Sequence, residues 1–401
     1  QRAAPVVYTR QPRSTKAYSD SRGSVEDASN WQHVTDVFRV FGPISEADVV
    51  LDDLRGTIEV IHDCTTSKEN CVAQEARVSP NGKLIAYSVS RANALMPLNV
   101  WGGPATDLFD LRASESEIWV YDTVTGLKKK LSSGHQDRMP EWVDNDTLLL
   151  ASDRAGIYAP LSTYGASFTN FYPFKALQIY KADIGDTGLT NFVNLTPEAA
   201  FAMNPLVASN GDILYSCWQG FGDRGIAHTP PNQWWICSMK ADGTNGRVEL
   251  AAHGSGYIKT TEYLKDWVDL KRAGEGVTII KATRPVTEIH KDYLAVSNYY
   301  RGNATGALGI ILGWERSEAE GALTAAEIPE SGSKDTRKGS ARYLPSTIKA
   351  LTPYASDQDA QPRFHKDGRA AGRAGYAAPW PGDGVGFMFT AARGWCYEAA
   401  S

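Results

Sequence analysis

Residues 76–88 read ARVSPNGKLIAYS, which is a short apolar segment, an Asn-Gly turn and then a run of apolar and aromatic residues. The same layout recurs at residues 140–152 (PEWVDNDTLLLAS) and 205–217 (PLVASNGDILYSC), so the pattern repeats about every 65 residues. Asn-Gly and Asn-Asp tolerate the positive φ angles that tight turns require. Each of the three stretches therefore predicts a β-hairpin.

A second hairpin pattern follows each of these stretches, within residues 117–131, 177–196 and 234–250. Two consecutive hairpins supply four antiparallel strands, which is the content of one β-propeller blade. Related runs of strand-forming residues occur at 5–9, 277–280, 293–297 and 386–390. Seven such runs, without long helical periodicity, predict an all-β protein. We expect a β-propeller with six or seven four-stranded blades and long inter-strand loops.

The domain organisation follows from the same repeat. We expect a single β-propeller domain over residues 1–401, with a loop insertion at 317–346, a segment rich in Ala, Glu, Ser and Lys. The last blade is expected to be incomplete, because no second hairpin follows the strand that ends at Thr390. Either the natural chain continues past Ser401 or another subunit completes the ring, since an unpaired strand edge would otherwise be exposed.

Composition excludes several classes of protein. The hydrophobic fraction is 42% and the charged fraction 22%, which are globular values that argue against disorder. The net charge of −5 does not favour a nucleic-acid or anionic-membrane binder. No apolar stretch reaches the roughly 18 residues of a membrane span. We therefore expect partners that are neither nucleic acid nor a membrane interior.

The cysteines and the first residue bear on the compartment. The five cysteines are Cys64, Cys71, Cys217, Cys237 and Cys396. Cys64 and Cys71 flank a polar loop that a disulfide could close, Cys217 and Cys237 could meet on neighbouring strands, and Cys396 is left without a partner. Numbering that starts at Gln1 indicates a removed segment, of which a secretory signal is the commonest kind. A periplasmic or extracellular location is favoured; five buried thiols in a cytosolic protein are the alternative.

The strand pattern carries a family resemblance. Residues 79–88, followed by 118–122 and a Thr-Gly turn, resemble the WD40-like repeat of TolB-type periplasmic propellers. The resemblance covers about residues 70–250. It implies a propeller fold and an exported protein.

A narrower resemblance concerns the later part of the chain. Its matching segments are residues 213–218, 223–224, 298–303, 351–353, 367–369 and 389–394. They are similar to propeller proteins of the hydrazine-synthase alpha-subunit type, which implies other protein subunits, c-type cytochromes among them, as partners. This chain has no Cys-x-x-Cys-His motif, so no covalent haem site can be assigned to it. The cofactor is unknown, and a metal ion is left open.

Three histidines are candidate metal ligands in the propeller funnel. His135 and His253 precede predicted innermost strands, and His228 lies in a Thr-Pro-Pro loop that could reach the same rim. Neutral imidazole suits copper and zinc. The favoured alternative is that each histidine caps a backbone carbonyl or faces solvent.

Four charged residues beside predicted strand ends are further funnel candidates. They are Arg138, Asp153, Arg154 and Arg301. Arginines around a funnel would bind a carboxylate or another oxyanion through paired hydrogen bonds. The alternative, which we favour, is that such Asp and Arg side chains join adjacent blades.

The sequence has no nucleophile elbow, phosphate-binding loop or zincin motif, so it points to no autonomous chemistry. The leading hypothesis is an exported binding and assembly module, a subunit of a periplasmic, cytochrome-associated redox complex. The alternative is a periplasmic oxidoreductase with a metal or haem-partnered site in the funnel. The catalytic residues are unknown, and whether the chain is an enzyme stays open.

Overall fold

The computed structural model describes residues 5–10, 48–67, 71–91, 98–100, 103–105, 115–157, 175–197, 201–220, 232–250, 256–258, 277–279, 282–299, 310–316, 345, 347–352, 373–379 and 386–392. These residues form 25 strands and no helix, which confirms the all-β prediction for this part of the chain. Within it, accordingly, no helix is long and apolar enough to cross a membrane. Of the predicted insertion at 317–346, only Pro345 lies among the described residues.

The strands, in chain order, are β1 (Val6–Arg10), β2 (Asp48–Asp52), β3 (Ile58–His62), β4 (Cys71–Val78), β5 (Leu84–Arg91), β6 (Leu98–Val100), β7 (Gly103–Ala105), β8 (Glu115–Asp122), β9 (Lys128–Lys130), β10 (Arg138–Trp142), β11 (Thr147–Ser152), β12 (Gln178–Ile184), β13 (Leu189–Asn194), β14 (Ala202–Val207), β15 (Ile213–Gly220), β16 (Asn232–Met239), β17 (Arg247–Leu250), β18 (Gly256–Ile258), β19 (Val277–Ile279), β20 (Ala282–His290), β21 (Tyr293–Tyr299), β22 (Ile310–Glu315), β23 (Lys349–Ala350), β24 (Arg373–Pro379) and β25 (Phe387–Ala392).

The repeated sequence pattern forms the hairpins that it predicts. Residues 76–88 lie in β4 and β5, residues 140–152 in β10 and β11, and residues 205–217 in β14 and β15. Gly82 and Gly211, at the same position of the repeat, have φ angles of 73° and 82°, which a side chain would disfavour. In both turns the glycine N–H donates to a carbonyl three residues earlier. The second hairpins form as β8–β9, β12–β13 and β16–β17.

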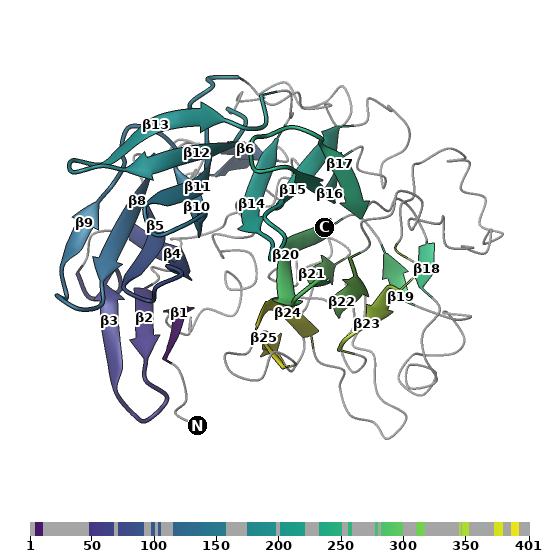
Figure 1. The fold of residues 1–401 in the computed structure, drawn as a ribbon, viewed down its shortest axis with the longest axis horizontal. Helices are drawn as coiled ribbons and strands as arrows, with labels where there is room; N and C mark the ends of the chain where they lie inside the picture. The colour runs from purple at the N-terminus through teal and green to yellow at the C-terminus, as the bar shows by residue number, and fades with distance from the viewer. Residues whose placement is uncertain are drawn as a thin grey trace.

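The strands assemble into five blades that follow one another in chain order around the molecule (Figure 1). Blade 1 is β1-β2-β3, blade 2 is β4-β5-β8-β9, and blade 3 is β10-β11-β12-β13. Blade 4 is β14-β15-β16-β17, and blade 5 is β20-β21-β22-β23; one parallel pairing, Trp234 with Ala282, connects β16 to β20, so that these two blades form one eight-stranded sheet. The first strand of each blade packs on the blade before it: β4 on β1, β10 on β4, β14 on β10 and β20 on β14. This repeated relation is that of a β-propeller.

The predicted number of blades is wrong for the described residues, which form five blades of three or four strands rather than six or seven of four. Two of the seven sequence runs explain the difference. Of the run at 277–280, residues 277–279 form β19, which pairs with β18 in a two-stranded sheet and belongs to none of the five blades of the described residues. The run at 386–390 forms β25, whose described partner is β24 alone. The β24–β25 hairpin packs on β20, β21 and β22, in the same relation that joins successive blades.

The core lies between the blades. One cluster joins blades 1 and 2 around Tyr87, a second joins blades 2 and 3 around Trp142, and a third joins blades 3 and 4 around Phe201. A smaller cluster seats Phe387 and Phe389 of β25 against blade 5. Burial of these apolar faces is the main force that holds the sheets face to face.

The first strands of blades 2, 3 and 4 share a β-bulge. One residue at each bulge has a left-handed backbone, namely Glu75 (φ 59°), Met139 (φ 56°) and Asn204 (φ 52°). The Glu75 carboxylate accepts the N–H of Met139 at 2.9 Å, and the Met139 Sδ accepts the N–H of Asn204 at 3.3 Å. The bulges therefore link three successive blades in series, an arrangement that hydrophobic periodicity does not reveal.

A buried arginine joins blades 4 and 5. Arg316, directly after β22, has a side chain that is 1% exposed. Its guanidinium donates to Asp212 at 2.6 Å and to Glu249 at 3.2 Å, both in blade 4. Lys240 also donates to Asp212. The buried Arg316 guanidinium and the two carboxylates therefore each have a partner of opposite charge.

Candidate functional site

The strands have two kinds of ends. The short hairpin turns, such as those at Gly82 and Gly211, lie at one end of the blades, because neighbouring strands are antiparallel. The other end carries the connections from β5 to β8, β11 to β12 and β15 to β16, together with the passages from one blade to the next. We call this end the long-loop rim. The predicted residues His135, Arg138, Asp153 and Arg154 all lie at this rim, beside the ends of β10 and β11.

The imidazole of His135 is fixed by Asp153. The distance from His135 Nδ1 to Asp153 Oδ1 is 3.2 Å, and the same oxygen accepts the N–H of Gln136 at 3.1 Å. The Lys175 ammonium lies 4.0 Å from the other carboxylate oxygen. The His135 side chain is 34% exposed, so the pair is open to solvent. These contacts tie the segment that precedes β10 to the end of β11.

Arg154 also binds the segment that precedes β10, through Asp137, and both residues belong to blade 3. It donates to Asp137 Oδ2 at 2.6 Å, and Ser152 Oγ donates to Asp137 Oδ1 at 2.6 Å. Asp137 is fully buried, and the Arg154 guanidinium lies 3.8 Å over the ring of Phe192. Because the Ser152 hydroxyl is committed to Asp137, it does not complete a catalytic triad with His135 and Asp153.

Arg138 forms a buried ion pair between blades. Its guanidinium donates to Glu75 Oε1 at 2.7 Å, and the two side chains are 6% and 8% exposed. The Ser88 hydroxyl donates to the other Glu75 oxygen, which also accepts the N–H of Met139. Arg138 thus joins β10 of blade 3 to β4 of blade 2. Sequence reasoning missed Glu75, although Glu75 and Met139 stand at equivalent positions of the repeat.

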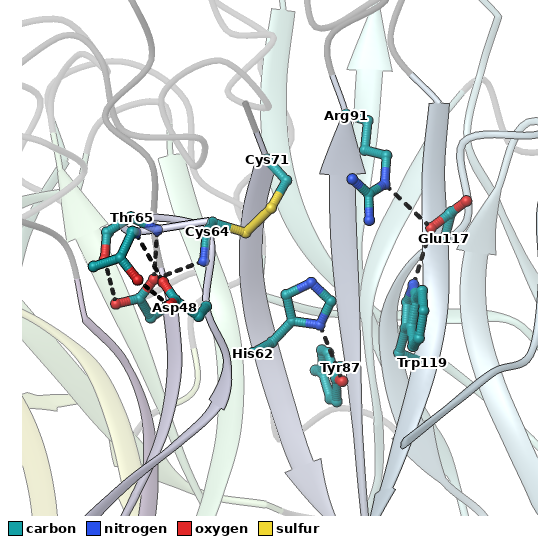
Figure 2. The surroundings of a disulfide bond; sticks show 11 residues. Asp48, His62, Cys64, Thr65, Cys71, Tyr87, Arg91, Glu117 and Trp119 are labelled. Atoms are coloured by element: carbon teal, nitrogen blue, oxygen red, sulfur yellow. Dashed lines mark hydrogen bonds and ion pairs between the residues drawn. A yellow bond between two sulfur atoms is a disulfide. The ribbon is translucent and has the colours of Figure 1, made fainter. Parts of the chain in front are cut away.

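The Cys64–Cys71 disulfide is present and bridges two blades at the same rim (Figure 2). Cys64 follows the last strand of blade 1, and Cys71 begins the first strand of blade 2. Asp48, which is fully buried, accepts the N–H groups of Cys64 at 2.9 Å and of Thr65 at 3.0 Å. Arg10 donates to the same carboxylate at 3.0 Å. Asp48 therefore fixes the backbone that carries one half of the disulfide.

The environment of Asp48 changes its pKa. Burial alone would raise the pKa of Asp48, but hydrogen bonds from Arg10, Thr65 and Cys64 together hold the pKa below its ordinary value. The carboxylate is accordingly ionised at neutral pH.

The second predicted disulfide is also present. Cys217 of β15 and Cys237 of β16 are bonded within blade 4, and their Cα atoms lie 5.9 Å apart. Both cysteines are largely buried. This bond crosslinks neighbouring strands of one sheet, whereas Cys64–Cys71 crosslinks two sheets.

The remaining candidates, His228, His253, Arg301 and Cys396, lie outside the described residues. The three-histidine metal site and the oxyanion role of Arg301 are therefore still predictions. What the described part of the rim provides is a set of paired charges and one crosslink that hold blades 1, 2 and 3 together.

These features define the chain as a β-propeller protein. The sequence matches no family model and no curated protein. Among solved structures, the Kuenenia stuttgartiensis hydrazine synthase is similar at a TM-score of 0.50 and 14% identity, over 99% of this chain and 45% of that chain. This chain thus spans less than half of that one. At this identity the likeness shows a common fold, in agreement with the resemblance seen in the sequence.

Two further solved structures are similar. The β-propeller domain of the Trilobed protease from Pyrococcus furiosus shares 12% identity over 78% of this chain and 80% of its own, with a TM-score of 0.35. The oligogalacturonate lyase from Vibrio parahaemolyticus shares 10% identity over 89% of this chain and 73% of its own, with a TM-score of 0.37.

Proposed function

We propose that the chain is an exported binding and assembly module that docks another protein subunit on the outer strand of blade 1. The observation that carries this proposal is the composition of β3, which pairs only with β2 among the described strands. Its side chains Ile58 and Val60 are 51% and 40% exposed, and Leu54 in the preceding turn is 46% exposed. An unpaired strand edge with exposed apolar side chains is a site for protein contact.

The outer strand of blade 2 provides the contrast. It consists of Lys128, Lys129 and Lys130, and a row of lysines is a common device that prevents an edge strand from pairing. The outer strand of blade 1 has no such row of lysines, and its one exposed charged side chain, Glu59, accepts a hydrogen bond from Tyr121 of blade 2. The difference between two neighbouring edges supports a partner at β3.

The occupant we infer is an extended segment of a partner protein that adds a strand to blade 1. Backbone groups of β3 would supply the hydrogen bonds, and Ile58 and Val60 would supply apolar contacts on the added side chains. The two disulfides support an oxidising, periplasmic or extracellular compartment. A hydrazine synthase shares this fold, and the sequence resemblance to that group implies a place in a redox complex with cytochrome subunits.

The experiment compares capture by the wild-type chain with capture by two matched variants. Val60→Lys places a charge on β3, and Val193→Lys does the same on β13, the outer strand of blade 3, where Val193 is 53% exposed. We expect the wild type and Val193→Lys to recover the same partner from the native source, and Val60→Lys to recover at least about tenfold less. Equal recovery by all three chains, or no recovery by the wild type, would refute the proposal.

The second candidate function is an oxidoreductase with a metal in the funnel. It needs His135, His228 and His253 together, and the supporting observation is that His135 stands at the long-loop rim with its Nδ1 held by Asp153. Such a partner on the second ring nitrogen is usual for a metal-bound histidine. Elemental analysis of protein from the native source tests this: stoichiometric metal, lost in His135→Ala, supports it, and metal-free protein excludes it.

A further inference from the structure

The disulfide at the long-loop rim lies beside a histidine. His62, Cys64 and Cys71 each place one donor atom within 4.8 Å of the others, and no other such group of His, Cys, Asp or Glu occurs in the described part of the chain. The three residues are 6%, 0% and 0% exposed. Once the disulfide is reduced, two thiolates and an imidazole in a buried position are the donor set of a thiophilic metal ion.

We propose that this group is a metal site in its dithiol form, with Zn²⁺ bound by the two thiolates and by the His62 imidazole. The disulfide must first be reduced. A phosphine reductant does this with one water molecule: the phosphine gains the oxygen, the S–S bond accepts two electrons, and the two water protons form the thiols. Metal binding then releases both thiol protons.

The backbone keeps both cysteines in place without the S–S bond. Asp48 holds the N–H groups of Cys64 and Thr65, and Thr65 Oγ1 also donates to it at 2.9 Å. Cys71 is paired with Arg91 in the β4–β5 ladder. These contacts do not involve sulfur, so they persist on reduction and keep the two thiols facing each other.

The orientation of His62 suits the third ligand. Its Nδ1 lies 3.2 Å from the Tyr87 hydroxyl, and its ring makes edge contacts with the rings of Tyr87 and Trp119. Figure 2 shows Tyr87 and the disulfide on different sides of the imidazole. We assign Nε2, the ring nitrogen that does not face Tyr87, as the ligand atom of the proposed site. Nδ1 would then donate its proton to the Tyr87 hydroxyl, and such an outer hydrogen-bond partner is usual for a metal-bound histidine.

The spacing requires little movement. Zn–S bonds of about 2.3 Å and Zn–N bonds of about 2.0 Å in a tetrahedral site place the ligand atoms about 3.5–3.8 Å apart. After reduction the two sulfurs must separate from their bonded distance to about 3.8 Å, and the imidazole nitrogen, which lies within 4.8 Å of both, must come to about 3.5 Å. Three protein ligands leave the fourth position to water.

The test titrates the full, phosphine-reduced chain with Co²⁺ and follows the thiolate-to-cobalt charge-transfer band, with Zn²⁺ competition to give the affinity. We expect one cobalt per wild-type chain. The Cys217→Ser/Cys237→Ser variant, which lacks the other disulfide, should keep the band, and Cys64→Ser/Cys71→Ser should lose it. His62→Gln should bind at least about tenfold more weakly, and Tyr87→Phe about tenfold more weakly with unchanged stoichiometry.

Circular dichroism of each reduced variant checks that the fold is kept. If Cys64→Ser/Cys71→Ser unfolds, the cobalt affinity of His62→Gln, compared with that of the wild type, tests the proposal. The proposal is overturned if the reduced wild type shows no thiolate band, if the band survives in Cys64→Ser/Cys71→Ser, or if His62→Gln binds as tightly as the wild type. The proposal does not depend on the docking function of β3, because neither Ile58 nor Val60 contributes a donor atom.

Discussion

At the scale of single residues, Asp48 fixes the backbone beside the Cys64–Cys71 crosslink, because its carboxylate accepts the N–H groups of Cys64 and Thr65. Cys64 and Cys71 flank a short polar loop, so their pairing could be read locally. Asp48, which fixes this loop, stands 16 residues before Cys64 and has no local signal. Glu75 and Arg138 are 63 residues apart, and only the repeat places them together.

Asp48 makes the stability of the rim depend on pH. Its pKa is lower in the folded chain than in the unfolded chain, where it is about 3.9. The stabilisation is therefore complete above pH 4 and is lost as the pH falls through the folded pKa. We expect Asp48→Asn to lower the free energy of unfolding by about 2 kcal/mol at pH 7. Urea unfolding of both chains from pH 7 to pH 3 should show this difference shrinking below pH 4; a constant or growing difference would contradict the assignment.

At the scale of elements, the hairpins were predictable and the contacts between blades were not. Turn residues and alternation fix which strands pair within a blade. The bulges of β4, β10 and β14 each contain a left-handed residue, of which Glu75 and Met139 accept hydrogen bonds from the next blade. Two of the three, Met139 and Asn204, precede proline. Proline disfavours the right-handed helical region for the residue before it, which is the one local signal that these bulges carry.

Two ion pairs between β4 and β10 provide a matched test of this interface. Arg138–Glu75 is buried, whereas in Arg77–Glu141 the arginine is 46% exposed. Burial raises the pKa of Glu141 even with Arg77 beside it, so its charge stabilises the fold little. We expect Glu75→Gln to cost about 3 kcal/mol, because Arg138 stays buried without its anion, and Glu141→Gln to cost less than about 1 kcal/mol. Denaturant unfolding measures both changes in the free energy of unfolding. Equal losses in the two variants would contradict the prediction that the buried ion pair at the bulge stabilises the interface more than the exposed one.

At the scale of the whole molecule, the order and the radial arrangement of the blades were predictable, and their number was not. A run such as 277–280 has the composition of a blade strand, yet it pairs with β18, and composition does not specify a partner. The funnel histidines show the same limit. The sequence places His135 before an innermost strand, whereas its link to Asp153 comes from the fold.

The most direct test of the central claim is a cryo-EM map of the protein purified in complex from its native source. We predict radially arranged blades with a strand of another subunit added to β3 of blade 1. A map in which the chain is alone and β3 is bare, or in which the sheets are not arranged around an axis, would contradict it.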